Sequence, residues 1–199
     1  MIPVRAEPIR GRRVTLRPLG PDDLPAKARW SMDRGLVGLM SGHPEFARAT
    51  FDEALAETRR WWDLRARETT SEQWAILGPD GSLIGSLDLH DLRPSPGPGQ
   101  RAGLVPEIGQ AEHRGQGLGT EAMELVVKRV FEDLGQVGLE VEVLAGNHRA
   151  RRAFEKIGFT ERGRRREEDG GTGGAGQSDV IEWVVMVLDR QGAGPPGCA

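Results

Sequence analysis

The stretch HRGQGLGTEAM, from His113 to Met123, carries glycine at three alternate positions directly before a segment with helical spacing. Apolar residues recur there every three or four positions up to Leu134-Gly135, which predicts an amphipathic helix with a glycine stop. The chain must therefore turn sharply and begin a helix at once. Unpaired amide N–H groups and the positive end of the helix dipole meet at such a turn, so it predicts an anion site with phosphate as the natural ligand.

The glycines allow a ligand to approach the backbone without Cβ atoms in the way. Arg114 and the hydroxyl of Thr120 can add contacts to a phosphate. A P-loop is excluded because its motif requires a lysine directly after the last glycine, and residues 115–121 contain none. The dinucleotide fingerprint G-x-G-x-x-A does match Gly117 to Ala122, and Glu140 or Glu142 lies about 20 residues on, where a ribose ligand is expected. A nucleotide-dependent oxidoreductase is therefore one alternative.

The segments before the glycines favour a different architecture. Two extended runs, QWAIL and SLIGSLDLHDL, flank Asp80-Gly81, which is a strong hairpin signal. AGLVPEIGQ predicts a further strand in which Pro106 removes a ladder donor, so we expect a bulge or an edge there. A Rossmann domain instead places its glycine turn after the first strand of repeated βαβ units.

Other patterns complete a mixed α/β chain. RVTLRPL near the start, GLEVEVL at 138–144 and VIEWVVMVL near the end are extended, and 51–67 is an amphipathic helix. Asn147 can cap a helix that runs to about Ile157 and ends at Gly158. We expect one domain over residues 11–189, a hairpin loop at 170–176, a flexible N-terminus at 1–10 and a Gly/Pro tail at 190–199.

Composition excludes several functions. The 27 basic and 30 acidic side chains nearly cancel, so nucleic acid and anionic membranes are not expected partners. The single cysteine, Cys198, allows no internal disulfide and no Cys-based metal site, which fits a reducing cytoplasm. His43 and His148 show no ligand spacing, so no metal is expected. No signal peptide and no membrane-spanning run is visible.

Two motifs together resemble the Gcn5-related N-acetyltransferase (GNAT) family. Arg114-x-x-Gly117-x-Gly119 is similar to the pyrophosphate loop [QR]-x-x-G-x-[GA] of that family. Asn147-x-x-Ala150-x-x-x-Phe154-x-Lys156-x-Gly158-Phe159 is similar to its downstream signature, with phenylalanine where tyrosine is usual. The resemblance extends from about Val14 to Leu188 and is closest to the branch that acetylates ribosomal-protein N-termini, polyamines and similar amines.

The resemblance implies a mixed α+β domain in which helices cover both faces of a sheet of about seven strands, splayed between the fourth and fifth. It also implies acetyl-CoA in that gap, with a primary amine of a small molecule or peptide as the acceptor. Separately, we expect the last strand to be an exposed sheet edge, which makes a homodimer a possible assembly. The backbone of Ile108, Gly109 and Gln110 would pair with the pantetheine arm. The expected cofactor-binding residues further include Arg114, Gly115, Gln116, Gly117, Leu118, Gly119, Thr120, Asn147, Arg152 and Phe154.

The chemistry that the resemblance implies is direct attack of a neutral amine on the thioester in a ternary complex. A lysine-like amine has a reference pKa of about 10.4, so a base must take its proton near pH 7. Glu107 is the candidate base, with Asp88 and His90 as substitutes, and Gly103 stands where many relatives carry glutamate. The usual acid is a tyrosine, yet the chain contains none and Phe154 cannot donate a proton. A non-catalytic acyl-CoA sensor therefore remains an alternative, and the acceptor amine stays open.

Overall fold

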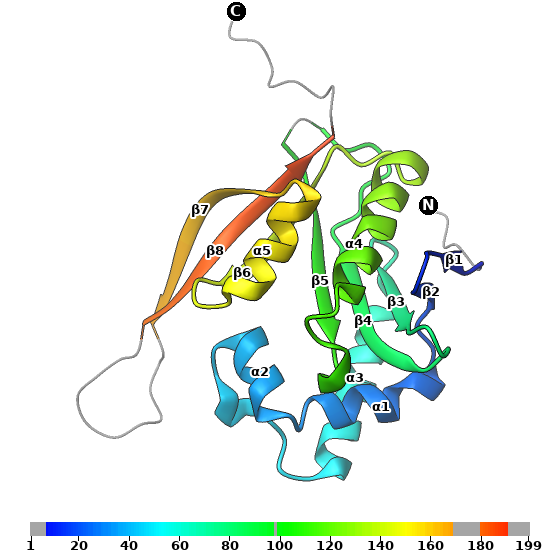
Figure 1. The fold of residues 1–199 in the computed structure, drawn as a ribbon, viewed down its shortest axis with the longest axis vertical. Helices are drawn as coiled ribbons and strands as arrows, with labels where there is room; N and C mark the ends of the chain where they lie inside the picture. The colour runs from blue at the N-terminus through cyan, green and yellow to red at the C-terminus, as the bar shows by residue number, and fades with distance from the viewer. Residues whose placement is uncertain (1–6, 98, 169–179, 191–199) are drawn as a thin grey trace, which may run out of the picture.

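The computed structural model describes residues 7–97, 99–168 and 180–190. Its centre is an eight-stranded sheet with the order β1-β2-β3-β4-β5-β6-β8-β7 (Figure 1). The strands are β1 (Ile9–Arg10), β2 (Thr15–Pro18), β3 (Glu72–Leu77), β4 (Leu83–His90), β5 (Ala102–Ile108), β6 (Gly138–Leu144), β7 (Thr160–Glu168) and β8 (Val180–Asp189).

Five α-helices accompany the sheet in the described ranges. They are α1 (Leu24–Trp30), α2 (Arg34–Ser41), α3 (Phe51–Arg65), α4 (Leu118–Lys128) and α5 (His148–Ile157). A π-helical turn, Arg129–Asp133, continues α4 to Leu134 and Gly135, so the predicted helix with a glycine stop is confirmed. Asn147 caps α5 and Gly158 ends it in the left-handed conformation, as the sequence predicts.

The sheet has one parallel contact. Strands β1 to β5 are antiparallel neighbours, and β6, β8 and β7 are antiparallel as well. Between these two parts, β5 pairs with β6 in parallel only at Ala102↔Leu139 and Gly103↔Glu140. The two strands separate beyond these residues, so the sheet opens toward Ile108 and Leu144. Figure 1 shows α5 and α4 on the near face of this opening.

The hydrophobic core lies between the sheet and the helices α4 and α5. The predicted helical stripe supplies Leu118, Ala122, Val126 and Val130, all buried, and β4 and β5 contribute Leu87 and Leu104 from one face. The opposite face of the same strands carries Ser86, Asp88 and Glu107, which face α1 and α3. In β4 and β5 one face is therefore apolar and the other carries these polar groups, whereas β3 places buried Glu72 on the helix-covered face, where it pairs with Arg129.

The predicted mixed α/β fold and the splay are confirmed, and two details differ. An eighth strand, β1, lies within the N-terminal segment that was expected to be flexible. When the strands are counted from β2, the splay falls between the fourth and the fifth strand, as expected. No bulge forms at Pro106, because the β4–β5 register is unbroken through Leu87↔Pro106. The predicted edge is confirmed, because β5 pairs with β6 only at Ala102 and Gly103. The lost donor is tolerated since β6 no longer accompanies β5 at this residue.

The dinucleotide-binding alternative is wrong at the level of topology. The glycine turn follows β5, whose long pairing with β4 is antiparallel, whereas the Rossmann turn follows a strand inside a parallel sheet. The last strand is also not the sheet edge that the dimer expectation used, because β8 lies between β6 and β7. No helix in the described ranges is long and apolar enough to cross a membrane. The predicted 170–176 loop and the 191–199 tail lie outside the described residues.

Candidate active site at the sheet opening

The glycine turn presents a row of amides with no acceptor. Gly115 and Gly117 adopt φ of +81° and +80°, a left-handed conformation that favours glycine. The first helical bond of α4 runs from Glu121 N to Gly117 O. Within the part of the chain that the structure describes, the six N–H groups of residues 115–120 donate to no oxygen. Consecutive free amides at a helix N-terminus form an anion-binding site.

Glu121 fixes this turn to the start of β2. Its buried carboxylate accepts from Arg13 N at 2.7 Å and from Arg13 Nε at 3.2 Å, and Arg13 Nη1 donates to Gln116 O at 3.0 Å. Burial disfavours the charged form, but the N–H groups of Arg13 outweigh that effect and hold the pKa of Glu121 below its ordinary value. The turn is thus positioned by a contact across the chain.

Arg114 connects the turn to two other elements. Its Nε donates to Ile108 O at 2.8 Å, and its Nη2 donates to Gly109 O and, at 2.9 Å, to Asp33 Oδ2. Asp33 also caps α2, and the Arg114 guanidinium holds the pKa of this carboxyl below its ordinary value. Arg114 therefore links the end of β5, the turn and α2.

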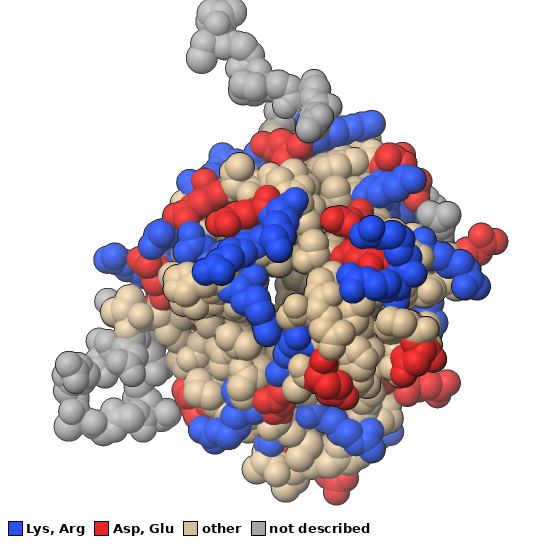
Figure 2. Space-filling view, viewed as in Figure 1, with Lys and Arg blue, Asp and Glu red and all other residues tan. Residues whose placement is uncertain are grey.

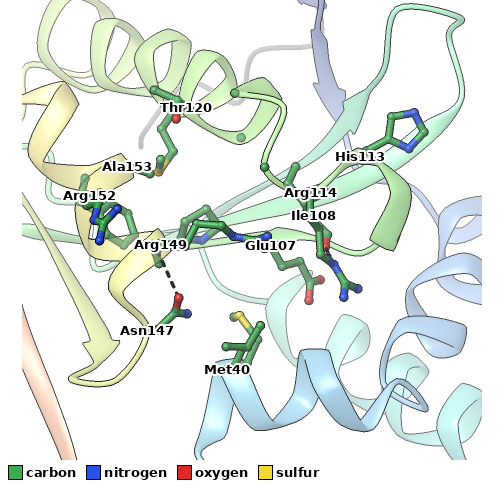
Figure 3. Close-up of a pocket in the computed structure, with 18 of the residues that line it drawn as sticks. Met40, Glu107, Ile108, His113, Arg114, Thr120, Asn147, Arg149, Arg152 and Ala153 are labelled. Atoms are coloured by element: carbon green, nitrogen blue, oxygen red, sulfur yellow. Dashed lines mark hydrogen bonds between the residues drawn. The ribbon is translucent and has the colours of Figure 1, made fainter.

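A cavity of about 670 Å³ lies where β5 and β6 separate. Figure 3 shows Thr120 on the first turn of α4 at one side, Arg149 and Arg152 on α5 at another, and Met40 on α2 facing the space between them. Leu36 and Leu39 line it beside Met40. The C-terminus of α2 reaches β8, because a Cβ on Gly42 would lie 2.9 Å from Ile181 Cδ1. Helix α2 therefore bridges the two halves of the open sheet.

Cations of α5 border the glycine turn. Three of them line the cavity: Arg149, Arg152 and Lys156. The Arg149 Nη1 atom would lie 3.7 Å from a Cβ atom added to Gly115. In the described ranges these three side chains have no hydrogen bond or ion pair. Figure 2 shows Lys and Arg side chains gathered beside a hollow in this face of the molecule. The positive charge and the free amides together favour a ligand with several phosphate oxygens.

Glu107 reaches the cavity from β5 and already has two partners. Its Oε1 is within ion-pairing distance of Lys27 Nζ and accepts from Ser86 Oγ at 2.7 Å. Both charged side chains are largely buried, with 15% of Glu107 and 20% of Lys27 exposed. Oε2 has no protein partner in the described structure. One carboxylate oxygen is thus held in place and the other is available to a proton.

The substitutes proposed for Glu107 lie elsewhere. Asp88 accepts from Gln73 Nε2 at 3.1 Å and from Arg65 Nε at 3.2 Å, and His90 Nδ1 lies 2.8 Å from Asp91 Oδ2. The His90 ring covers Gly103, where a Cβ would clash at 2.1 Å. Neither residue lines the cavity.

Phe154 and Asn147 serve the structure of α5. Phe154 is buried, and its ring lies 5.5 Å from that of Phe159, edge to face. Asn147 Oδ1 accepts from Ala150 N at 3.2 Å (dashed in Figure 3). Both residues also line the cavity.

The remaining expected residues divide into two groups. Ile108, Gly115, Gly117, Gly119, Thr120 and Arg152 line the cavity. Four expected residues do not line the cavity. Gly109 packs under the Trp30 ring, and Gln110 donates to the carbonyls of Leu83 and Ile84. The Gln116 side chain donates to the Glu112 carbonyl, and Leu118 lies in the core. Gln116 and Leu118 can therefore take part in the anion site only through their backbone amides.

The sequence is matched by the model of an acetyltransferase (GNAT) domain over residues 13–160. The chain belongs to the GNAT acetyltransferase family. The match covers the glycine turn, the cavity and α5. The splayed sheet and the turn at its opening are accordingly those of a GNAT fold.

Individual relatives agree with this assignment. YdaF of Bacillus subtilis strain 168, named as a candidate ribosomal N-acetyltransferase, is 32% identical over 91 residues, 44% of this chain and 46% of that protein. The alignment thus spans less than half of that relative. A spermidine N-acetyltransferase of Vibrio cholerae in complex with CoA and spermine has a TM-score of 0.73 at 18% identity, covering 92% of this chain and 99% of that one. RimL, a ribosomal-protein N-acetyltransferase in complex with coenzyme A, gives 0.72 at 13% identity, covering 92% and 98%. At these identities the structures show a shared fold.

Sequence reasoning missed several residues that line the cavity or contact its lining. Lys27 lies 80 positions before Glu107, and no local pattern joins them. The apolar wall of α2 was missed because Leu36, Leu39 and Met40 lie in a short segment that also contains three glycines and is followed by a proline. Arg149 and Lys156 had a usable signal, because they share a face of α5 with Arg152 at helical spacing.

Proposed function

We propose that the protein is an N-acetyltransferase that uses acetyl-CoA and transfers its acetyl group to a primary amine by direct attack in a ternary complex. The single observation that carries this proposal is the row of six acceptor-free amides at the glycine turn, placed where β5 and β6 separate. The family, and the CoA bound in the spermidine N-acetyltransferase and in RimL, support it.

The residues present suit such a donor. Amides of residues 115–120 would hold the pyrophosphate, and Arg149, Arg152 and Lys156 supply positive charge beside it. Gly119 lets the turn approach Ile108, since a Cβ there would lie 3.2 Å from Ile108 Cγ1. When bound, acetyl-CoA supplies an activated acetyl thioester.

Glu107 is the proposed base for the acceptor. Lys27 and Ser86 fix its Oε1, which leaves Oε2 to take the proton of the attacking ammonium or of a bridging water. Thr120 is the only hydroxyl-bearing residue among the described lining residues, and it lies beside the glycine turn. The described lining residues include no serine, cysteine or tyrosine, so we favour direct attack over a covalent acyl-enzyme.

Proton delivery to the departing thiolate has no dedicated side chain. Phe154 occupies the position of the family tyrosine and is packed against Phe159. We therefore expect solvent to protonate the thiolate and turnover to be modest. The same observation favours a second candidate, an acyl-CoA sensor that binds without turnover.

Release of free thiol from acetyl-CoA, measured across small amines, polyamines, aminoglycosides and peptides with free N-termini, tests the proposal. Gly117→Val should abolish coenzyme A binding because valine strains at φ +80°. Gly163→Val is the matched control, since a side chain at Gly163 meets open space. Coenzyme A binding without thiol release from any amine would favour the sensor.

A further inference from the structure

Lys27 is a cation held directly behind Glu107, the carboxylate that lines the cavity. Its ammonium contacts the Glu107 carboxylate, lies 3.0 Å from Ser86 Oγ and sits 4.9 Å from the centre of the Trp61 ring. These partners come from β5, β4 and α3, so the charge is held from three directions. An ammonium over an aromatic face is further stabilised by cation–π attraction.

The charges around the cavity are strongly unequal. Glu107 is the only carboxylate among the described lining residues, and Lys27 neutralises it. The lining cations are Arg114, Arg149, Arg152 and Lys156, of which Arg114 pairs with Asp33. The other three lie on α5 beside the glycine turn, where the phosphates of a donor would neutralise them. Those phosphates would leave the charge of Lys27 in place, because Lys27 lies on α1 and pairs with Glu107 of β5.

An amine with a second positive charge needs an anion in the acceptor site. We propose that Lys27 is a specificity-determining residue, which occupies that anion and so excludes diamines and polyamines in favour of acceptors with a neutral or apolar body. The apolar wall formed by Leu36, Leu39 and Met40 suits such a body. Like charges brought together at a binding site cost enough to set specificity. This inference rests on the proposed acetyltransferase function.

Matched acceptors test the inference on the wild-type protein. Each pair differs by one charge: aminopentanol against cadaverine, and an alanyl-norleucyl peptide against an alanyl-lysyl peptide. We expect kcat/KM to favour the neutral member by about tenfold or more. Equal values, or a polyamine as the best acceptor of the amine panel, would overturn the role of Lys27 while leaving the proposed function intact. Absence of thiol release with every amine would contradict both.

Substitution of the lysine supplies the second test. Lys27→Met frees the Glu107 carboxylate and should reduce the preference for the neutral acceptor by about tenfold, whereas Lys27→Arg should keep it. Lys128→Met is the matched control, because Lys128 is 70% exposed on α4 and far from the cavity lining. Thermal unfolding and coenzyme A titration verify that each variant is folded. An unchanged preference for the neutral acceptor in folded Lys27→Met would overturn the inference. If that variant does not fold, the kcat/KM values of the matched acceptor pairs on the wild-type protein decide the question.

Discussion

Arg114 shows how one residue of a recognised motif can act through structure. Its guanidinium spans the carbonyls of Ile108 and Gly109 and the carboxylate of Asp33. A planar fork with donors in fixed directions makes these contacts at once, and lysine cannot reproduce them. Arg114 is therefore a positioning residue for the glycine turn.

Arg114→Lys should lower the free energy of unfolding by about 1–3 kcal/mol, because buried acceptors lose their donors. Coenzyme A affinity should fall with it, since the turn loses its link to β5. Urea unfolding and calorimetric titration measure both quantities. Arg166→Lys is the control: Arg166 is 75% exposed, so a change within about 0.5 kcal/mol is expected. A stable Arg114→Lys protein that binds coenzyme A normally would contradict the positioning role.

Phe154 permits a test of proton delivery at the same scale. Phe154→Tyr adds a hydroxyl at the position where relatives carry one, and a general acid typically contributes at least about a hundredfold. We expect kcat to rise by about tenfold or more with unchanged coenzyme A affinity. Phe159→Tyr, which does not line the cavity, should give no such gain. An unchanged kcat for Phe154→Tyr would mean that the missing acid does not limit turnover.

At the scale of elements, the start of α4 depends on Glu121. The folded state lowers the pKa of this carboxyl, so its contribution to stability is complete above the unfolded value of about 4.3. The contribution is lost as the pH falls through the lower pKa of the folded state. Acid should therefore loosen the contact between α4 and the start of β2.

Glu121→Gln should cost about 1–2 kcal/mol of unfolding free energy at neutral pH, because a charge-assisted bond becomes a neutral one. The difference from wild type should begin to narrow below about pH 4.3, where the unfolded carboxyl takes up its proton, and should narrow further until the pH passes the lower pKa of the folded state. Urea titrations at several pH values measure this trend. Glu124→Gln, on the exposed side of α4, should change little at any pH. A difference that stays constant with pH would contradict the role given to the Glu121 charge.

Helix α2 is the element that joins one wall of the cavity to both halves of the sheet. Asp33 ties its N-terminus to Arg114, and Gly42 packs its C-terminus against Ile181 of β8. Three apolar side chains of α2 line the cavity between these ends. The position of α2 therefore sets the width of the cavity.

At the scale of the whole molecule, local patterns predicted the elements well. The glycine turn, the helix after it, the Asp80-Gly81 hairpin and the Asn147 cap each depend on contacts within a few residues, and the structure contains all of them. Strand β1 escaped prediction because two residues carry no periodicity. The splay came from the family resemblance rather than from a pattern in β5 or β6.

Long-range partners could not be predicted in the same way. Arg114 and Asp33 are 81 residues apart, and Lys27 and Glu107 are 80 apart, so no spacing rule relates them. The sequence indicated which residue types were available near the turn. It could not indicate that Asp33 and two carbonyls would occupy Arg114, or that Lys27 would neutralise Glu107.

The central claim is that amides of residues 115–120 bind the pyrophosphate of the acyl donor. The most direct measurement is an amide NMR titration with coenzyme A, compared with pantetheine, which lacks the phosphates. The account predicts large shifts at Gly115, Gly117 and Gly119 with coenzyme A and small ones with pantetheine. Saturating coenzyme A that leaves these three amide resonances unmoved would contradict it.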